Sequence, residues 1–172
     1  MLCFFPLLQL QKIRMVVEIN KGQSLVHLRK FDNVGKNILQ IDFDYDFLLT
    51  AIVSHVKDYQ LCWQFNKKLG FDFIRQEDLE INLSNKRKLS YFSMFNFQDE
   101  LNQINLTLLS NKTAGDNLIQ ELVKVDYFLM IRDNYENLDQ EELLKKIRSL
   151  PDVQTAFEVE VNELVSKQNL IF

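Results

Sequence analysis

The sequence predicts an α+β fold, in which an N-terminal helical hairpin packs on a mainly antiparallel sheet and a strand–helix–strand unit ends the chain, giving a two-layer sandwich. Three observations support this prediction. Apolar residues recur at helical spacing in residues 46–70, they alternate as in strands in residues 89–109, and residues 125–161 have the pattern of a strand, a helix and a second strand. Doubly wound proteins instead alternate strands and helices along the whole chain, so this order is typical of an α+β protein.

The chain of 172 residues has the length of one domain. We expect residues 1–36 to be an N-terminal extension that is partly disordered or precedes the true start, for which Met15 is the alternative. Within it, residues 24–30 alternate weakly and predict a short strand. Residues 37–172 are predicted to form a single α+β domain.

The predicted domain begins with a half-buried strand and the helical hairpin. Apolar residues alternate with aspartates over residues 38–44, which indicates a strand with one acidic face. Asp46 then suits the N-cap of a first helix over residues 47–55. A second helix is predicted to begin near Asp58 and to end at Gly70, because glycine favours the position that follows a helix.

A block rich in strand patterns follows the hairpin. Residues 71–74 predict a short strand, and residues 89–97 and 102–109 alternate as two longer strands. Residues 98–101 between these two, Gln98-Asp99-Glu100-Leu101, suit a hairpin connection. Residues 111–117 are predicted to form a polar loop.

The C-terminal unit consists of a strand over residues 125–132, a helix over residues 139–150 and a strand over residues 155–161. The first strand is almost continuously apolar, as is typical of a central strand. Pro151 ends the helix. A unit of this length packs its helix on one face of a sheet, and it resembles half of a ferredoxin-like module such as the small-ligand domains of the ACT type.

Composition and charge disfavour several classes of protein. A net charge of −4 and a pI near 5.2 disfavour nucleic-acid binding, which depends on Lys and Arg. The apolar run over residues 1–8 is too short to span a membrane and lacks the features of a signal peptide. Cys3 and Cys62 form no disulfide framework. We therefore expect a soluble cytoplasmic protein that binds neither nucleic acid nor membrane. The sequence does not decide between a monomer and a homodimer.

One segment resembles a known family signature. Its residues are Ile119-Gln120-Glu121-Leu122-Val123-Lys124-Val125-Asp126-Tyr127. The segment is similar to the signature of the IPExxxVDY family, small uncharacterised proteins of Bacteroidota, with Gln120 in place of the proline. Residues 41–47, 54–55, 57–63 and 166–172 are similar as well, so the likeness covers roughly residues 38–172. The resemblance implies a bacterial protein and no particular activity.

The signature marks Glu121, Asp126 and Tyr127 as candidate site residues. On a strand, Asp126 and Tyr127 point to opposite faces. Glu121 precedes the strand, where a carboxylate commonly accepts backbone N–H bonds or pairs with arginine. The sequence favours a structural latch, a set of bonds that holds this loop on the sheet, over a recognition site for a partner.

The best candidate metal ligands are the three carboxylates Asp42, Asp44 and Asp46, which would lie on one face of a strand. A divalent cation would relieve their mutual repulsion. This spacing also opens an EF-hand loop, but Phe47 and Val53 stand where that loop needs Gly and Glu. A solvated strand face that ends in a helix cap is therefore the favoured interpretation.

Catalytic groups are scarce, and we predict no catalytic residue. His55 would lie on the apolar side of the first helix as a structural histidine, and Cys62 would be a small core residue. Their separation in the sequence disfavours a nucleophile–base pair, which needs contact at about 3 Å. Trp63 is predicted to pack or to lie in an interface. No glycine-rich phosphate loop and no paired-cysteine spacing occur, so we expect no cofactor.

Three hypotheses of function follow, in order of preference. The first is a non-catalytic cytosolic interaction domain that binds an unknown protein partner through its sheet edge or an aromatic surface, which 14 Phe and few catalytic groups favour. The second is a small-ligand regulatory module built on the ACT-like half. The third is a metal-dependent enzyme that uses Asp42, Asp44 and Asp46.

Overall fold

The computed structural model describes residues 27–29, 40–42, 45–83 and 89–172. The chain divides into two compact units, residues 1–44 and residues 45–172. In the first unit, β1 (His27–Arg29) pairs antiparallel with β2 (Gln40–Asp42). Both strands lie within ranges where the sequence predicts strands.

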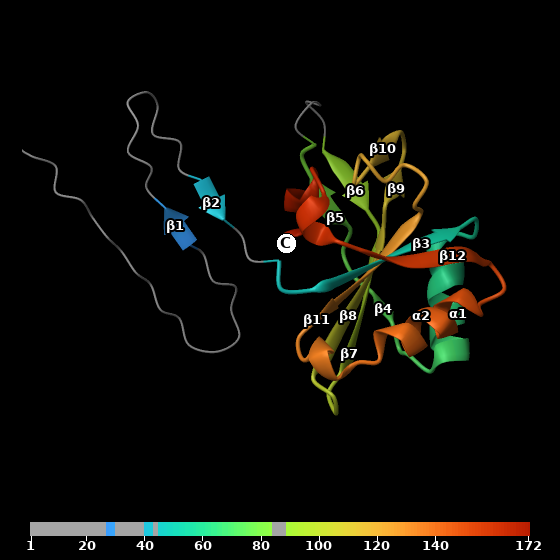
Figure 1. Cartoon of the computed structure of the whole chain (residues 1–172). Helices are drawn as coiled ribbons and strands as arrows, with labels where there is room; N and C mark the ends of the chain where they lie inside the picture. The colour runs from blue at the N-terminus through green and yellow to red at the C-terminus, as the bar shows by residue number, and fades with distance from the viewer. Residues whose placement is uncertain (1–26, 30–39, 43–44, 84–88) are drawn as a thin grey trace, which may run out of the picture. The chain divides into compact units, whose positions relative to one another are not determined.

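The second unit is built on a six-stranded sheet in the order β12-β3-β11-β8-β7-β4, in which every neighbouring pair is antiparallel (Figure 1). Its strands are β3 (Leu48–Ser54), β4 (Ile74–Arg75), β7 (Met94–Asp99), β8 (Ile104–Ser110), β11 (Tyr127–Arg132) and β12 (Val153–Val159). β3 lies between β11 and β12, so these two strands are parallel to each other. The structure thus confirms an α+β fold with a mainly antiparallel sheet.

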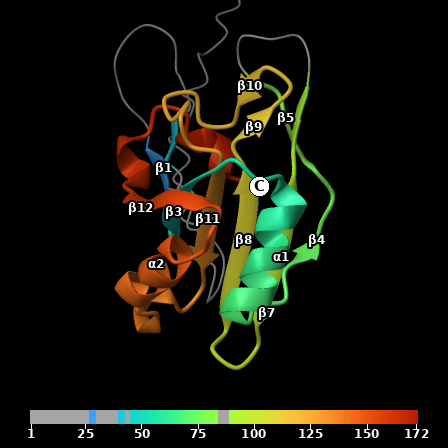
Figure 2. The same ribbon diagram turned by 90° about the vertical axis from the view of Figure 1, so that its right-hand side faces the viewer.

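Two α-helices in the described residues cover one face of the sheet (Figure 2). They are α1 (Asp58–Leu69) and α2 (Gln140–Arg148). Gly70 follows α1 with a φ of 77°, in the left-handed region where glycine is favoured. At the start of α2, the Asp139 carboxylate accepts a bond from the Glu142 N–H at 2.8 Å. Neither helix is long and apolar enough to cross a membrane.

The opposite face of the sheet is covered by short elements and loops. These are β5 (Leu79–Ile81) paired with β6 (Ser90–Phe92), β9 (Lys112–Thr113) paired with β10 (Asp116–Asn117), and the 3-10 turns η2 (Val161–Glu163) and η3 (Lys167–Leu170); η1 (Tyr135–Asn137) precedes α2. Apolar residues from this cover pack on the sheet, among them Phe92, Leu118, Val161 and Leu170. The sheet is therefore buried on both faces.

Alternate residues of β11 belong to the two separate cores. Leu129 and Ile131 pack under the helices, whereas Phe128 and Met130 pack on the opposite side. All four are fully buried. This arrangement confirms the prediction that the continuous apolar run of residues 125–132 is a central strand, and β11–α2–β12 confirms the strand–helix–strand unit.

The prediction of a helical hairpin is wrong, because the residues that were expected to form its first helix form the strand β3. Leu48, Ala51 and Ile52 are spaced as on one side of a helix, but this strand buries both of its faces and apolar residues need not alternate. β-branched residues such as Thr50, Ile52 and Val53 also favour extended backbone. The second predicted helix is α1. The predicted strand over residues 89–97 is divided at Ser93 into β6 and β7.

Truncation of two phenylalanines that flank the same residue tests the two-sided burial of the sheet. Phe128 on β11 and Phe157 on β12 both pair with Ala51, but Phe128 is fully buried and Phe157 is 38% exposed. Phe128→Ala is expected to lower the free energy of unfolding by about 3–5 kcal/mol, and Phe157→Ala by about 1 kcal/mol. Urea denaturation measures both, and equal losses would contradict the described core.

Candidate functional site

Asp126 of the signature joins three segments of the chain. Its Oδ2 accepts a bond from the Ser54 N–H at 2.9 Å, and its Oδ1 accepts one from Lys112 Nζ at 2.7 Å. Its backbone N–H donates to the Ile52 carbonyl at 3.0 Å. These bonds fix the end of β3 against the start of β11.

Tyr127 of the signature is buried under the helices. Its hydroxyl donates to the Val56 carbonyl at 2.6 Å. Burial raises the pKa of Tyr127 to about 12, with further contributions from the nearby negative charges of Asp58 and Asp126. The phenol therefore stays neutral at physiological pH and serves as a hydrogen-bond donor.

Glu121 of the signature holds the C-terminal segment, residues 160–172. Its carboxylate accepts bonds from the Ser166 N–H at 2.9 Å and from the Ser166 hydroxyl at 2.7 Å. Burial raises the pKa of the Glu121 carboxyl, but the bonds from Ser166 and from the backbone of Glu121 and Val165 lower it, and the resulting pKa lies below the ordinary value. The carboxylate is thus ionised where it binds this segment.

Asn111 completes this arrangement and was not singled out from the sequence, where Ser110-Asn111 resembles an ordinary loop. Asn111 is fully buried. Its Nδ2 donates to the carbonyls of Leu122 and Val125, both at 2.9 Å, and its Oδ1 accepts from the Ile119 N–H at 2.9 Å. One side chain thus satisfies three backbone groups of the loop before β11.

The signature side chains do not converge on one point. Each side chain has its own partners. Glu121 binds Ser166, and Asp126 binds the Ser54 N–H and Lys112. Tyr127 binds the Val56 carbonyl. Bonds of this kind, mostly to backbone groups, are those that a structural latch requires. Recognition of a partner by these residues stays a prediction.

The residues considered for catalysis have separate environments. Cys62 is buried and donates to the Phe73 carbonyl at 3.7 Å; burial raises its pKa to about 11, helped by Asp58 and Asp72. His55 does not lie on an apolar helical side as predicted: it follows β3, is exposed and contacts the Gln154 side chain. A thiol with a raised pKa is a poor nucleophile.

The three candidate metal ligands lie mostly outside the described residues. Asp44 and the side chain of Asp42 are outside the part of the chain that the structure describes. The Asp46 carboxylate accepts a bond from the Tyr135 hydroxyl. Within the described ranges, no group of three or more His, Cys, Asp or Glu is placed to hold a metal ion.

A cavity of about 320 Å³ lies beside α2 where β12 leaves the sheet. β12 pairs with β3 only as far as Val159 opposite Leu49, whereas β11 continues to Ile131 opposite Leu48. The start of β3 therefore lacks a neighbour on the β12 side. The cavity is lined by Tyr45, Phe47, Leu48, Leu49, Thr50, Ile131, Gln140, Leu143, Glu158, Val159, Glu160, Val161 and Asn162.

Thr50 is the least exposed polar side chain of this cavity, at 4% exposure. It lies on the helix-facing side of β3, between Leu48 and Ile52, and Glu158 is directly opposite it on β12. Its hydroxyl has no hydrogen-bond partner among the described residues. The buried side-chain atoms without a partner in the described residues are Gln64 Oε1 and Asn105 Oδ1, so the Thr50 hydroxyl is instead open to the cavity, where water or a ligand can bond to it.

The C-terminal segment that Glu121 holds also forms one wall of the cavity. Next to Ser166, Lys167 donates to the Asn162 carbonyl at 3.1 Å and lies over the Tyr45 ring, 5.1 Å from its centroid. Both Asn162 and Tyr45 line the cavity. The signature residue Glu121 is thus connected to the cavity wall through adjacent residues of one segment.

Comparison of the chain with protein-family models, with curated proteins and with solved structures gives no match. The resemblance of residues 119–127 to the IPExxxVDY signature therefore stays a prediction.

Replacement of Glu121 tests its role in holding the C-terminal segment. Because its pKa is lowered on folding, the carboxylate contributes stability above the unfolded pKa of about 4.3, and this contribution is lost as pH falls through the folded pKa. Glu121→Gln is expected to lower the free energy of unfolding by about 0.5–1.5 kcal/mol at pH 7, and by less at pH 3. Glu163→Gln, an exposed change in the same segment, is the control. A loss that does not depend on pH would contradict the role of the charge.

Removal of the Tyr127 hydroxyl tests its bond to Val56. Tyr127→Phe leaves the Val56 carbonyl without this donor and is expected to cost about 0.5–1.5 kcal/mol. In the wild type, the raised pKa lowers stability as pH rises from about 10 to about 12, because only the unfolded tyrosine then ionises. Unfolding measured at pH 9 and pH 11 should show a smaller pH effect in Tyr127→Phe. An equal effect in both proteins would assign it to other groups.

Proposed function

We propose that residues 45–172 form a non-catalytic domain that binds a small ligand in the cavity between β3, β12 and α2. The observation that carries this proposal is the hydroxyl of Thr50, a residue with 4% exposure, which has no partner among the described residues and opens on the cavity. This is the second of the hypotheses that the sequence supports.

The cavity has the composition of a binding site for a small molecule. Leu48, Ile131 and Leu143 supply apolar walls, while Thr50 and Gln140 supply polar groups. Its volume of about 320 Å³ is at the lower end of the range for ligand sites. The Thr50 hydroxyl has no protein partner in the described residues, so it is available to bond to a ligand in the cavity.

The free edges of the sheet support protein binding less well. β4 has only two residues at one edge. At the other edge, the Arg148 side chain donates from Nε to the Ala156 carbonyl of β12 at 2.7 Å. An added strand would have to displace this bond, and covered or short edges are how proteins prevent such pairing.

The proposal makes a prediction about the stability of the empty protein. Thr50→Val keeps the side-chain shape and removes a hydroxyl that has no protein partner, so it is expected to change the free energy of unfolding by less than about 0.5 kcal/mol. The control is Thr107→Val on β8: Thr107 is equally buried, at 4% exposure, but its hydroxyl bonds to Asn96 Oδ1 at 3.5 Å. This control should lose stability. Equal losses in both variants would show that the Thr50 hydroxyl has a partner, and would overturn the proposal.

Native mass spectrometry of the protein purified gently from its host tests occupancy directly. The wild type is expected to carry a small-mass adduct. Leu143→Trp, whose larger side chain would occupy part of the cavity, is expected to lose it while staying folded. An adduct of equal abundance in this variant would place the ligand elsewhere.

A protein-interaction role is the second candidate function, and one observation favours it. Tyr59 and Trp63 lie four residues apart on the outer side of α1, and each is 58% exposed. Tyr and Trp are the residues most enriched in binding hot spots. A host protein that co-purifies with the wild type and with Phe157→Ala, but not with Tyr59→Ala/Trp63→Ala, would support this role. Retention in the double variant would exclude α1 as the contact.

A further inference from the structure

We infer that the ligand of the β3–β12 cavity is a small organic cation, an ammonium group on a short apolar body. This inference rests on the proposed function and adds the chemical class of the ligand. It follows from the charges of the lining residues, from the position of Thr50 opposite Glu158, and from the apolar walls.

Carboxylates dominate the charge of the cavity. Glu158 and Glu160 line it, and no Lys, Arg or His is among its lining residues in the described part of the chain. Glu158 has no ion pair or side-chain hydrogen bond there, and Glu160 accepts only a 3.4 Å bond from Asn162. Glu158 and Glu160 are exposed at the edge of the cavity, as Glu141 and Glu142 are on α2, but the glutamates of α2 are paired with Lys145 and Lys146. Two uncompensated carboxylates attract a cation.

Thr50 and Glu158 together form a site for an ammonium group. They are opposite each other in the antiparallel pairing of β3 and β12, so their Cβ atoms are separated by about 4.5–5.5 Å on the same face. An ammonium nitrogen has three donors. Placed between the two side chains, it would donate to the Thr50 hydroxyl and to the Glu158 carboxylate, and the second bond would be charge-assisted.

The nearby end of α2 does not reverse this preference. Helix N-termini favour anions, but the first turn of α2 already carries Glu141 and Glu142, and its N-cap Asp139 uses its carboxylate on the Glu142 N–H. The carboxylates that an anionic ligand would meet in the cavity are therefore Glu158 and Glu160, because Glu141 and Glu142 do not line it.

The apolar walls favour an organic cation over a hydrated metal ion. The walls formed by Leu48, Ile131 and Leu143 suit an organic body, and no group of three or more His, Cys, Asp or Glu among the described residues is placed to supply the ligands that Mg²⁺ and Ca²⁺ require. The rings of Tyr45 and Phe47 also line the cavity, but Lys167 and Arg132 already lie over them, at 5.1 Å and 5.8 Å from the ring centroids. Recognition of the charge thus depends on the carboxylates, with the aliphatic walls around the body of the ligand.

Three probes of equal length test the inference on the full chain at pH 7. They are n-pentylamine, which is cationic, 1-pentanol, which is neutral, and pentanoate, which is anionic. Isothermal titration calorimetry is expected to show n-pentylammonium binding at least about tenfold more tightly than 1-pentanol, and pentanoate more weakly than either. Added salt should weaken only the binding of the cation.

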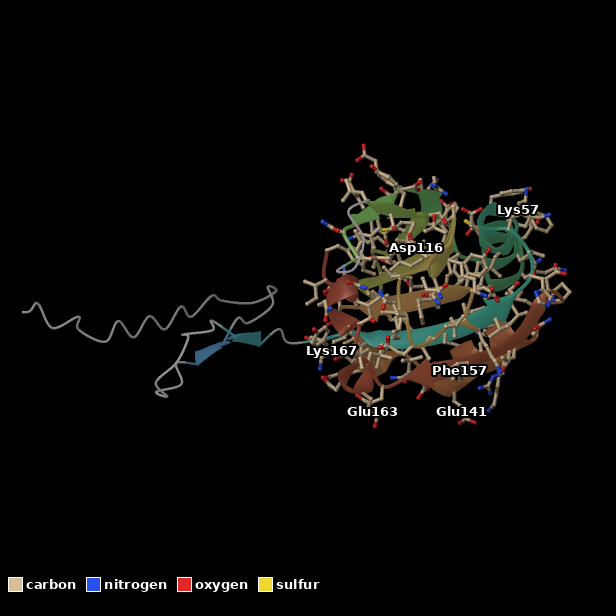
Figure 3. The ribbon with its side chains drawn as sticks, turned by 90° about the horizontal axis from the view of Figure 1, so that it is seen from above. Lys57, Asp116, Glu141, Phe157, Glu163 and Lys167 are labelled. Atoms are coloured by element: carbon tan, nitrogen blue, oxygen red, sulfur yellow. The ribbon has the colours of Figure 1, made fainter. Side chains whose placement is uncertain are left out.

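A matched pair of variants locates the charge that matters. Glu158→Gln is expected to lower the affinity for n-pentylammonium about tenfold and to leave 1-pentanol unchanged. Glu163→Gln is the control, because Glu163 does not line the cavity and Figure 3 shows it pointing outward, as Glu141 does. Its effect should be less than about twofold. A melting curve confirms that both variants are folded.

The possible outcomes separate this inference from the proposed function. Equal binding of the amine and the alcohol, or equal effects of the two variants, would overturn the cationic ligand while the cavity still binds. Tighter binding of pentanoate would also overturn it. If none of the probes binds, the inference fails, and the comparison of Thr50→Val with Thr107→Val decides separately whether the cavity is a binding site.

Discussion

The position of β3 between β11 and β12 is the constraint on which the rest of residues 45–172 depends. Its pairing with both neighbours places Ile52 opposite Tyr127 on one side and opposite Ala156 on the other. A shift of β3 by one residue would move Thr50 to the opposite face and expose apolar residues that two cores now bury. Asp126 prevents such a shift at the end of the strand, since it bonds to the backbone of both Ile52 and Ser54.

The structural latch and the proposed ligand cavity belong to one arrangement. Asp126 holds β3 against β11, the pairing of β3 with β12 places Thr50 opposite Glu158, and Glu121 holds the C-terminal segment through Ser166. The adjacent Lys167 binds Asn162 in the cavity wall. The signature residues therefore need not touch a ligand to matter for binding, because they position the strand and the segment that enclose the cavity.

The sequence predicts the C-terminal half of the fold well, for physical reasons that its residues make plain. The continuous apolar run of β11 predicts a strand that is buried on both faces of the sheet. The capping residue Asp139 predicts the start of α2. β3 is mispredicted because a strand buried on both faces loses the period of two, and its apolar residues then match helical spacing equally well. Local patterns, in short, do not distinguish a buried strand from a buried helix.

The candidate site is harder to predict, since its residues acquire meaning only through distant pairing. Thr50 resembles any polar residue within an apolar run, and Glu158 resembles any solvated glutamate. They become neighbours because β12 pairs with β3 across about a hundred residues of sequence. Asn111 was missed for the same reason, as its three backbone partners follow it in a loop with no regular pattern. The resemblance to a family signature drew attention to Glu121, Asp126 and Tyr127, and their contacts explain a structural role.

Methyl-resolved NMR during a titration with n-pentylammonium is the most direct test of a cavity that binds a cation beside Thr50. The methyl groups of Leu48, Ile131 and Leu143 line the cavity, whereas those of Leu118 and Leu170 lie in the core on the other face of the sheet. Binding in the cavity predicts shifts in the first group, contacts between ligand protons and the Thr50 methyl group, and little change in the second group. Shifts spread over both groups, or confined to residues away from the cavity, would contradict it.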